Sequence, residues 1–322
     1  MGRFVIRRLA QLVPVVLAIA TLNFLLLQLA PGDAADIVAG RSGHATAEMV
    51  EQLRRDFGLD LPVHQQYLVY LERLMTLNLG YSFIYELPVA TLILERLPAT
   101  LLLMVLSITL AIGLGILLGL TAARNRGGVI DNVVSVLALV IYAIPQFWLG
   151  LMLIVFFSIT LGILPSGGMI DVRVRDTGFV YALDVARHLV LPVLTMALFY
   201  VAIYTRLMRA TMLEVYELDF ITTARAKGVS ERGVAWRHAA RNALLPVVTL
   251  AGVQFGHLLG GSILVETVFG WPGLGRLVFD SLQQRDLNLL LGILFVSSVV
   301  VVLANLVADL AYSLLDPRIV HQ

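Results

Sequence analysis

Long apolar runs alternate with polar stretches along this chain, and six of these runs are long enough to cross a lipid bilayer as helices. The hydrocarbon core of a bilayer is about 30 Å thick, which a helix of roughly 20 residues crosses. The runs lie at residues 9–30, 97–122, 133–163, 188–208, 244–265 and 289–312. The pattern predicts an all-α integral membrane protein with six transmembrane helices.

An even number of crossings places both termini on one side of the membrane. The loops on that side are richer in Arg and Lys than the loops on the other, which is typical of cytoplasmic loops. The first run follows Arg3, Arg7 and Arg8, but no small-residue cleavage site follows it, so we expect a retained helix and not a signal peptide. The prediction is a multi-pass protein with both termini in the cytoplasm.

The spacing of the runs predicts three parts. Residues 1–96 hold the first transmembrane helix and a large external segment, in which residues 45–57 favour a short exposed helix. Residues 97–316 form a five-helix core with a long cytoplasmic loop at 209–245, and residues 317–322 form a cytoplasmic tail.

Composition supports this class of protein. The chain is 59% hydrophobic and 14% charged, whereas soluble domains have about 25% charged residues. The net charge of +1 argues against a nucleic-acid partner, which requires a concentrated basic face. The absence of cysteine removes disulfides, thiolate metal sites and cysteine nucleophiles. Membrane lipid is therefore the expected surrounding.

No motif for catalysis or metal binding is found. The single lysine, Lys227, is not part of a G-x-x-x-x-G-K-[ST] loop, so we expect no ATPase site in this chain. Neither H-E-x-x-H nor G-x-S-x-G occurs, and the six histidines are scattered without ligand spacing. The expectation is a protein that is not an enzyme, with no catalytic residue, metal site or cofactor of its own.

The long cytoplasmic loop predicts a short helix over residues 220–227. Asp219 is placed to act as its N-cap, and Arg225 and Lys227 complement the helix dipole in the last turn. Gly228 follows as a left-handed C-cap. Ser230 then predicts a second N-cap, beginning a second short amphipathic helix that extends toward Pro246. By charge alone, the loop is equally compatible with arginines that only anchor helix ends at anionic lipid.

Sequence motifs in the loop resemble the EAA loop of ABC importer permeases, the segment that contacts the ATPase. These motifs are Thr223-Ala224-Arg225-Ala226-Lys227-Gly228 and Arg241-Asn242-Ala243-Leu244-Leu245-Pro246. Two departures, Thr222 at the position of the initial glutamate and a longer spacer before the proline, resemble the dipeptide, oligopeptide and nickel branch. The resemblance assigns coupling to the ATPase to Asp219, Thr223, Ala224, Arg225, Ala226, Lys227 and Gly228.

The resemblance covers nearly the whole chain. Further motifs are Pro31-Gly32-Asp33, Leu79-Gly80-Tyr81-Ser82, Pro145-Gln146-Phe147-Trp148, the stretch of residues 266–276 and Asp316-Pro317-Arg318. The family implies a type-I importer fold in a bacterial inner membrane and a heterodimer with a paralogous permease. It also implies an extracytoplasmic substrate-binding protein and two cytoplasmic ATPase subunits, which bind the ATP and Mg.

The fifth run has two different faces. Gly252, Gly256 and Gly260 recur every four residues and predict a packing seam for another helix. The opposite face carries Gln254, His257 and Gly261, at about 100° per residue, and we expect it to line the translocation pathway. An equally open alternative is that these polar groups only bond to neighbouring helices.

Two proline-containing segments are expected to shape the protein. Pro145 predicts a kink in the third run, which serves either as a gate or only as shape. After the fifth run, residues 268–288 are too polar to cross and are rich in turn residues. We expect this segment to contribute to an external vestibule where the binding protein docks, through Trp271, Pro272, Gly273 and Gly275.

The leading functional prediction is a channel-forming permease subunit of an ATP-driven importer for di- or oligopeptides, working by alternating access. Import of nickel or another small nutrient by the same branch is the nearest alternative, because the shared motifs serve assembly and coupling. A self-sufficient ion-coupled carrier or channel would be expected to show intramembrane acids and inverted repeats. A scaffold without transport ranks last, because it leaves the polar face and the capped loop unexplained.

Overall fold

The computed structural model describes residues 2–29, 48, 51–52, 54–55, 60–171 and 178–315. Most of the expected helix at residues 45–57 lies outside this part of the chain. The chain divides into two compact units. Unit 1 contains Met1–Arg96 and Val278–Val302, and unit 2 contains Leu97–Leu277 and Leu303–Gln322. The division at residues 1–96 and 97–316 that the apolar runs suggested stays a prediction.

Unit 1 contains helix α1 (Gly2–Leu29) and helix α4 (Val63–Met75), which packs against it. The ring of Phe24 lies 5.2 Å from that of Tyr67 and 5.7 Å from that of Tyr70. The hydroxyls of Thr21 and Tyr67 are 2.7 Å apart. Helix α4 was not predicted from the sequence, because its 13 residues are too few to cross a membrane and none of them is buried.

A small hairpin in unit 1 pairs strand β1 (Tyr81–Ser82) with strand β2 (Leu87–Pro88) in antiparallel register. The buried hydroxyl of Ser82 donates to Oδ2 of Asp286 at 2.5 Å. Oδ1 of Asp286 accepts the backbone N–H of Leu289 at 3.1 Å, at the start of helix α13 (Leu287–Leu315). The hairpin is thus fastened to the N-terminus of a helix that lies far away in the sequence.

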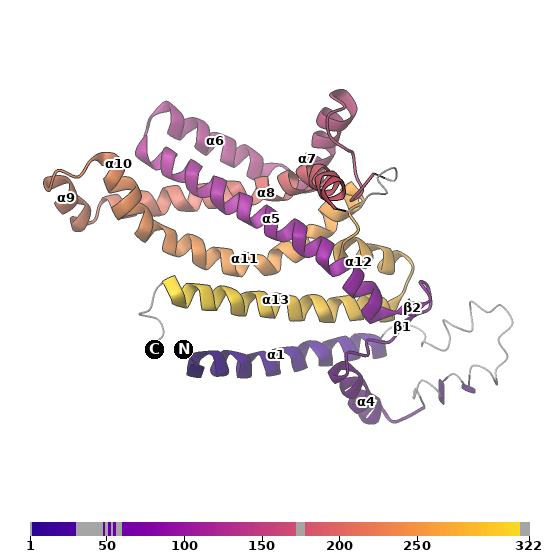
Figure 1. Ribbon diagram of the computed structural model, residues 1–322. Helices are drawn as coiled ribbons and strands as arrows, with labels where there is room; N and C mark the ends of the chain where they lie inside the picture. Colours follow the sequence, from indigo (N-terminus) through magenta and orange to yellow (C-terminus); the bar gives the residue numbers. More distant parts are fainter. Residues whose placement is uncertain are drawn as a thin grey trace. The chain divides into compact units, whose positions relative to one another are not determined.

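Unit 2 is built around one long helix. Its elements are the greater part of α5 (Val89–Arg124), then α6 (Val129–Ala143), α7 (Gln146–Leu153), the π-helix η1 (Ile154–Thr160), α8 (Phe179–Tyr216), α9 (Asp219–Ala226), α10 (Glu231–Gly233), the π-helix η2 (Val234–Ala239), α11 (Ala240–Phe269) and the start of α12 (Leu274–Gln283). Helix α8 packs against α6, α7 and α11 (Figure 1). It therefore supplies much of the core.

Helices α5 and α8 approach each other closely because glycines face the contact. A Cβ atom added at Gly119 would lie 2.6 Å from both Cβ of Met208 and the carbonyl oxygen of Thr205. One turn earlier, a Cβ at Gly115 would overlap Tyr204. Small residues at this spacing allow two helix backbones to pack tightly in a membrane.

The expected third span is broken at the proline. Helix α6 ends at Ala143, Pro145 precedes α7, and the two apolar segments meet at an angle of 103°. The break falls where the sequence predicts a kink, because proline lacks the N–H that would continue the helix.

Among the described residues, α1, α5, α8 and α13 are long and apolar enough to cross a membrane, and the bent pair adds a fifth span if it crosses as one. The expected span at residues 244–265 lies within α11, of which Leu259–Phe269 forms a shorter apolar helix. The count of six crossings therefore stays a prediction.

Candidate functional site

The loop between α8 and α11 contains a short helix that ends in a well-defined cap. Gly228 has a φ of 78°, in the left-handed region that favours glycine. Its N–H donates to the carbonyl of Arg225 at 2.9 Å, and the N–H of Val229 donates to that of Ala224 at 3.2 Å. This pair of bonds is the Schellman motif, which satisfies carbonyls at the end of a helix. The C-cap predicted at Gly228 is confirmed.

The N-terminus of α9 differs from the prediction. The N-cap residue is Leu218, whose side chain makes no capping hydrogen bond, and Asp219 is the first residue of the helix. A carboxylate in the first turn still favours the positive end of the helix dipole. The tight turn after α8, in which the N–H of Leu218 bonds to the carbonyl of Val215, moves the helix start one residue back.

The second cap is formed by Ser230, whose Oγ accepts the N–H of Gly233 at 3.3 Å. However, the expected second short helix is not separate. It passes from α10 through η2 directly into α11, so that residues 231–269 form one continuous helical path. A π-helix places one extra residue in a turn, and this allows the path to continue without a break. Pro246 lies inside α11 and does not end it.

An ion pair closes the loop. Nε and Nη2 of Arg225 donate to the two carboxylate oxygens of Glu231 at 2.8 and 3.2 Å. The hydrogen bond from Arg225 holds the pKa of Glu231 below its usual value, and Glu231 in turn raises the pKa of Arg225. The guanidinium also lies 5.7 Å from the centre of the Tyr216 ring. Arg225 therefore joins α9 to both neighbouring elements.

Helix α9 has one buried face and one exposed face. Ile221 and Ala224 are buried, and α9 packs against η2, which contributes the buried Val234 and Ala235. The opposite face is exposed at the other coupling residues inferred from the resemblance, which are Asp219, Thr223, Arg225, Ala226 and Lys227. Ala224 is thus a packing residue, whereas the others are available to a partner.

Large apolar side chains are exposed around α9. Phe220 is 40% exposed, Leu218 48% and Trp236 44%. Lys227, at the end of α9, is also exposed, so apolar and cationic side chains are both accessible around this helix. Exposed aromatic residues beside a rigid helix are typical of a protein interface.

The residues proposed for the pathway lie on α11. Gln254 is partly buried, and the side chain of His257 lies outside the described part of the structure. A Cβ at Gly261 would lie 3.5 Å from Oε1 of Gln146 and 3.8 Å from the hydroxyl of Tyr200. Gly260, expected to pack against another helix, has open space beside it within this chain. Near residues 260 and 261, α11 therefore packs within this chain through the side that carries Gly261. The role of Gly261 in a translocation pathway stays a prediction.

The turn that follows α11 is folded tightly into unit 2. Trp271, Gly273 and Gly275 are buried, and Nε1 of Trp271 donates to the carbonyl of Ala99 at 3.0 Å. Pro272 is partly buried. These residues, expected at an external vestibule, are mostly enclosed, and their part in docking stays a prediction.

A buried carboxylate organises this turn. Glu266, at the end of α11, accepts a hydrogen bond from the hydroxyl of Thr100 at 2.8 Å and from the N–H of Arg276 at 3.0 Å. The absence of a side chain at Gly273 leaves room for the carboxylate. Glu266 was part of a recognised motif but was not singled out as a site residue. An acid at the end of an apolar run is the signal that marks it, because a buried charge needs several partners.

No group of three or more His, Cys, Asp or Glu side chains that could hold a metal ion occurs among the described residues. The main features of unit 2 are a capped loop helix with an exposed face, a broken helix, and a turn held by hydrogen bonds between distant residues.

Comparison with known proteins places these features in a family. A family described as "Binding-protein-dependent transport system inner membrane component" matches residues 115–321, and the N-terminal family of the same membrane components matches residues 1–104. A putative peptide transport system permease protein of Brucella abortus is 40% identical over 319 residues, which is 99% of both chains.

Two further relatives match along their full length. The dipeptide transport system permease protein DppB of Escherichia coli K12 is 39% identical over 339 residues, covering all of both chains, and the di/tripeptide transport system permease protein DppB of Pseudomonas aeruginosa is 38% identical over 333 residues, covering 99% of each. Among solved structures, an inward-facing MetNI methionine ABC transporter matches 70% of this chain and 96% of its own, with a TM-score of 0.57 and 18% identity.

The structural likeness shows the fold, which is that of a type-I ABC importer permease. The apolar helices and the two family matches together indicate a multi-pass inner-membrane protein. The capped helix α9 lies in the part of the chain that the larger family match covers. This chain therefore belongs to the family of binding-protein-dependent transport system inner membrane components, the permease subunits of ABC importers.

Proposed function

We propose that this protein is a permease subunit of an ATP-driven importer of di- or oligopeptides. The observation that carries the proposal is the 38–40% identity, over nearly the full length, to relatives named as peptide transport permeases. Coverage of the whole chain matters, because it includes the helices that line a pathway as well as the coupling loop. No feature of the described residues favours nickel over peptide.

The exposed face of α9 is the contact with an ATPase. Its end is fixed by the Schellman motif, its side by the Arg225–Glu231 pair, and its inner face by Ile221. A short helix held in three ways moves as a rigid body when a partner moves it. Two partner ATPases bind the ATP and Mg, and this chain contributes no ATPase site.

The transport cycle is alternating access. Closure of the ATPases moves α9, and that movement changes the opening of the helical core from outward to inward. A paralogous permease completes the pathway, and an external binding protein delivers the peptide. The face of α11 that carries Gln254, His257 and Gly261 contacts the solute. Both termini lie in the cytoplasm, on the side of α9.

The first experiment is purification of the protein from its native membrane in mild detergent, followed by mass spectrometry of what stays bound. We expect a second permease and ATPase subunits. The same complex in liposomes, supplied with the binding protein, is expected to take up a dipeptide or an oligopeptide only when ATP is present. Uptake of nickel but not of any peptide contradicts the proposed substrate, and uptake by the isolated chain without ATPases contradicts the proposed class of transporter.

Substitutions on the fifth helix test the pathway. Replacing Gln254 or His257 by Ala is expected to lower peptide uptake at unchanged expression. Gly113→Ala on α5 is a matched control, because a Cβ at Gly113 meets nothing within 4 Å. Normal uptake by both α11 variants contradicts the assignment of this face to the pathway.

A further inference from the structure

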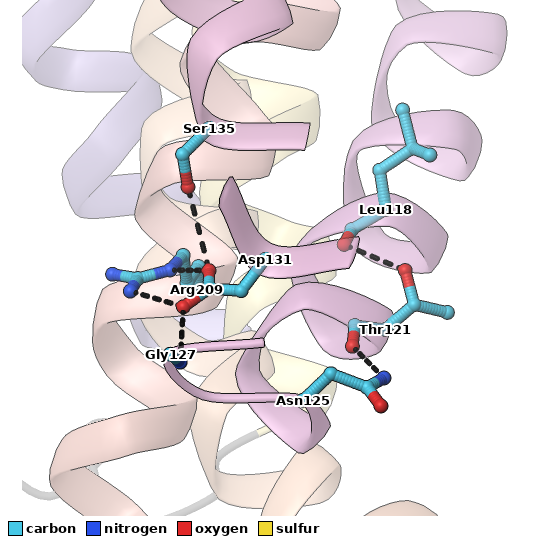
Figure 2. Close-up of polar contacts among 7 residues, drawn as sticks. All are labelled: Leu118, Thr121, Asn125, Gly127, Asp131, Ser135 and Arg209. Carbon is cyan, nitrogen blue, oxygen red and sulfur yellow. Dashed lines mark hydrogen bonds and ion pairs between the residues drawn. The ribbon is translucent and has the colours of Figure 1, made fainter. Parts of the chain in front are cut away.

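Two ion pairs connect the α5–α6 region to the end of α8 within the described part of unit 2. In the first, Arg126 and Glu217 approach to 3.6 Å, and their side chains are 68% and 72% exposed. In the second, Arg209 is paired with Asp131, which is only 2% exposed (Figure 2). The first pair contributes little, because solvent screens exposed charges. In the second pair the carboxylate is buried, whereas the Arg209 side chain is 31% exposed.

Every acceptor position of Asp131 is directed toward a neighbour, as Figure 2 shows. Nε of Arg209 donates to Oδ1 at 2.5 Å, and Nη2 donates to Oδ2 at 2.8 Å. The N–H of Gly127 donates to Oδ2 at 2.9 Å, and the hydroxyl of Ser135 lies 3.4 Å from Oδ1. A bidentate contact between a guanidinium and a carboxylate fixes both the distance and the relative orientation of the two groups. The carboxylate therefore joins α6, the turn before it and α8 at one point.

Arg209 lies near the end of the helix that precedes α9. Helix α8 ends at Tyr216, two turns beyond Arg209, and only Glu217 and Leu218 separate that end from α9. The same end of α8 contacts α11, because Oγ1 of Thr211 lies 3.1 Å from the carbonyl oxygen of Ala243 as well as within reach of two carbonyls of α8 itself. A displacement of α9 would therefore reach the last turns of α8, as well as η2, against which α9 packs.

Helix α6 extends from the pair to the break at Pro145. Asp131 is in its first turn, and Tyr142 is in its last. The ring of Tyr142 stacks on that of Phe199 of α8 with centres 5.4 Å apart, and the guanidinium of Arg206 lies 4.7 Å over the same ring. The far end of α6 therefore contacts α8 through softer ring contacts, whereas the near end is held by directed hydrogen bonds.

We propose that Asp131 and Arg209 are a positioning pair, which transmits movement of α9 through α8 to the broken helix formed by α6 and α7. The inference rests on the proposed function, because α9 moves only when a partner ATPase drives it. The pair holds the start of α6 to α8 throughout the cycle, so that both helices move together. The change of angle then occurs at Pro145 and not at the contact between α6 and α8.

The test substitution is Arg209→Lys in the assembled complex. Lysine keeps the positive charge beside Asp131 but cannot make the bidentate contact with its carboxylate. Peptide uptake and ATP hydrolysis are measured together in proteoliposomes. We expect hydrolysis to continue while uptake per ATP falls by at least about fivefold, the lower end of typical coupling between sites. Arg126→Lys in the exposed pair is the matched control and is expected to keep the normal ratio.

A parallel fall of uptake and hydrolysis with an unchanged ratio overturns the proposal, because a pair with only a structural role lowers the amount of working complex and not its coupling. The same conclusion follows if Arg126→Lys lowers the ratio as much as Arg209→Lys.

A distance measurement tests the pair without reference to the substrate. The chain has no cysteine, so spin labels are introduced at Leu137→Cys on α6 and Glu214→Cys on α8, both at exposed positions. With Arg209 present, we expect the distance between labels to stay the same when the ATPases are trapped in the closed state. With Arg209→Lys, we expect it to change or broaden. A distance that already changes with Arg209, or stays fixed with Lys, contradicts the proposal.

The two proposals fail in different ways. A complex that hydrolyses ATP but imports no peptide contradicts the proposed substrate, and the label distances still decide the role of the pair. A chain that binds no ATPase overturns both proposals.

Discussion

Helix α11 is bordered by two turns of opposite kinds. The loop before it, around α9, is exposed and held by contacts between residues close in sequence, such as Arg225 with Glu231. The turn after it is buried and held by residues far away in sequence, such as Thr100 with Glu266 and Ala99 with Trp271. Under the proposed function, the first is contacted and moved by a partner ATPase, whereas the second stays in place. Substitutions in the two turns should therefore differ in what they damage.

The largest effect is expected from Gly275→Ala in the buried turn. The added Cβ would lie 2.6 Å from Cα of Ile263 and 2.8 Å from its nitrogen, and backbone atoms cannot move aside easily. Overpacking of this kind costs about 3 kcal/mol. We expect a clear loss of thermal stability of the purified protein in detergent. Gly113→Ala, where the Cβ has open space, is the control; equal melting temperatures for the two variants would contradict the rigid turn.

A somewhat smaller effect is expected from Glu266→Gln. The hydroxyl of Thr100 donates to Oε1 and the N–H of Arg276 donates to Oε2, and the amide keeps the shape of the side chain but replaces one of these two acceptors by a donor. Leaving a buried donor unpaired costs about 2 kcal/mol. The melting temperature should fall, and the further loss on adding Thr100→Ala should be smaller than the loss from Thr100→Ala alone, although that substitution also removes the acceptor of the Leu274 N–H. Strictly additive losses would mean that the two residues do not act through one hydrogen bond.

In the exposed loop, Gly228→Ala tests function more than stability. Space is open beside Gly228, so the cost comes from its left-handed backbone alone, about 1 kcal/mol confined to the end of α9. We expect the melting temperature to change little while ATP hydrolysis becomes uncoupled from uptake, and a β-branched residue should have a stronger effect. Ala226→Gly, at the exposed last residue of α9, is a control for loosening of the helix itself. Full coupling in Gly228→Val would contradict a rigid connector.

The smallest effect is expected from acidification. The pKa of Glu231 is lowered in the folded loop because Arg225 donates hydrogen bonds to it. The Arg225–Glu231 pair therefore stabilises the folded loop at pH values above the ordinary pKa of a glutamate, near 4.5. This stabilisation is lost as the pH falls through the lowered pKa of Glu231. Amide hydrogen exchange in residues 225–233, corrected for intrinsic rates, should increase as the pH falls from 4.5 through the lowered pKa of Glu231. In the Glu231→Gln variant, the same amides should exchange faster at neutral pH, and their exchange should no longer show this pH dependence.

The loop illustrates what could be predicted from sequence and why. Gly228 and Ser230 were assigned as caps correctly, because a cap depends on the residue and its nearest neighbours. Asp219 was predicted to be the N-cap of α9, but it is the first residue of the helix. The turn after α8, and not the side chain of Asp219, determines where α9 begins. The continuation of η2 into α11 was missed, because a π-helix has no strong local signal.

Long-range partners could not be predicted in the same way. Asp131 and Arg209 are 78 positions apart, and the apolar pattern alone gives no reason to pair them. Glu266 lay in a recognised motif, yet only the folded turn shows that its carboxylate is buried against Thr100. The sequence marks such residues as charges in apolar surroundings, but it does not identify the residue that each one contacts.

The sequence by itself determined that the chain forms apolar helices, where the third of them breaks, and that a capped helix follows α8, because each depends on hydrophobic length, on proline or on a local cap. Only the tertiary structure decided the 103° angle at the break, the side of α11 that packs, and the partner of each buried charge. These features depend on which helices pack together. That packing depends on the shape and polarity of helix surfaces whose residues are far apart in the sequence.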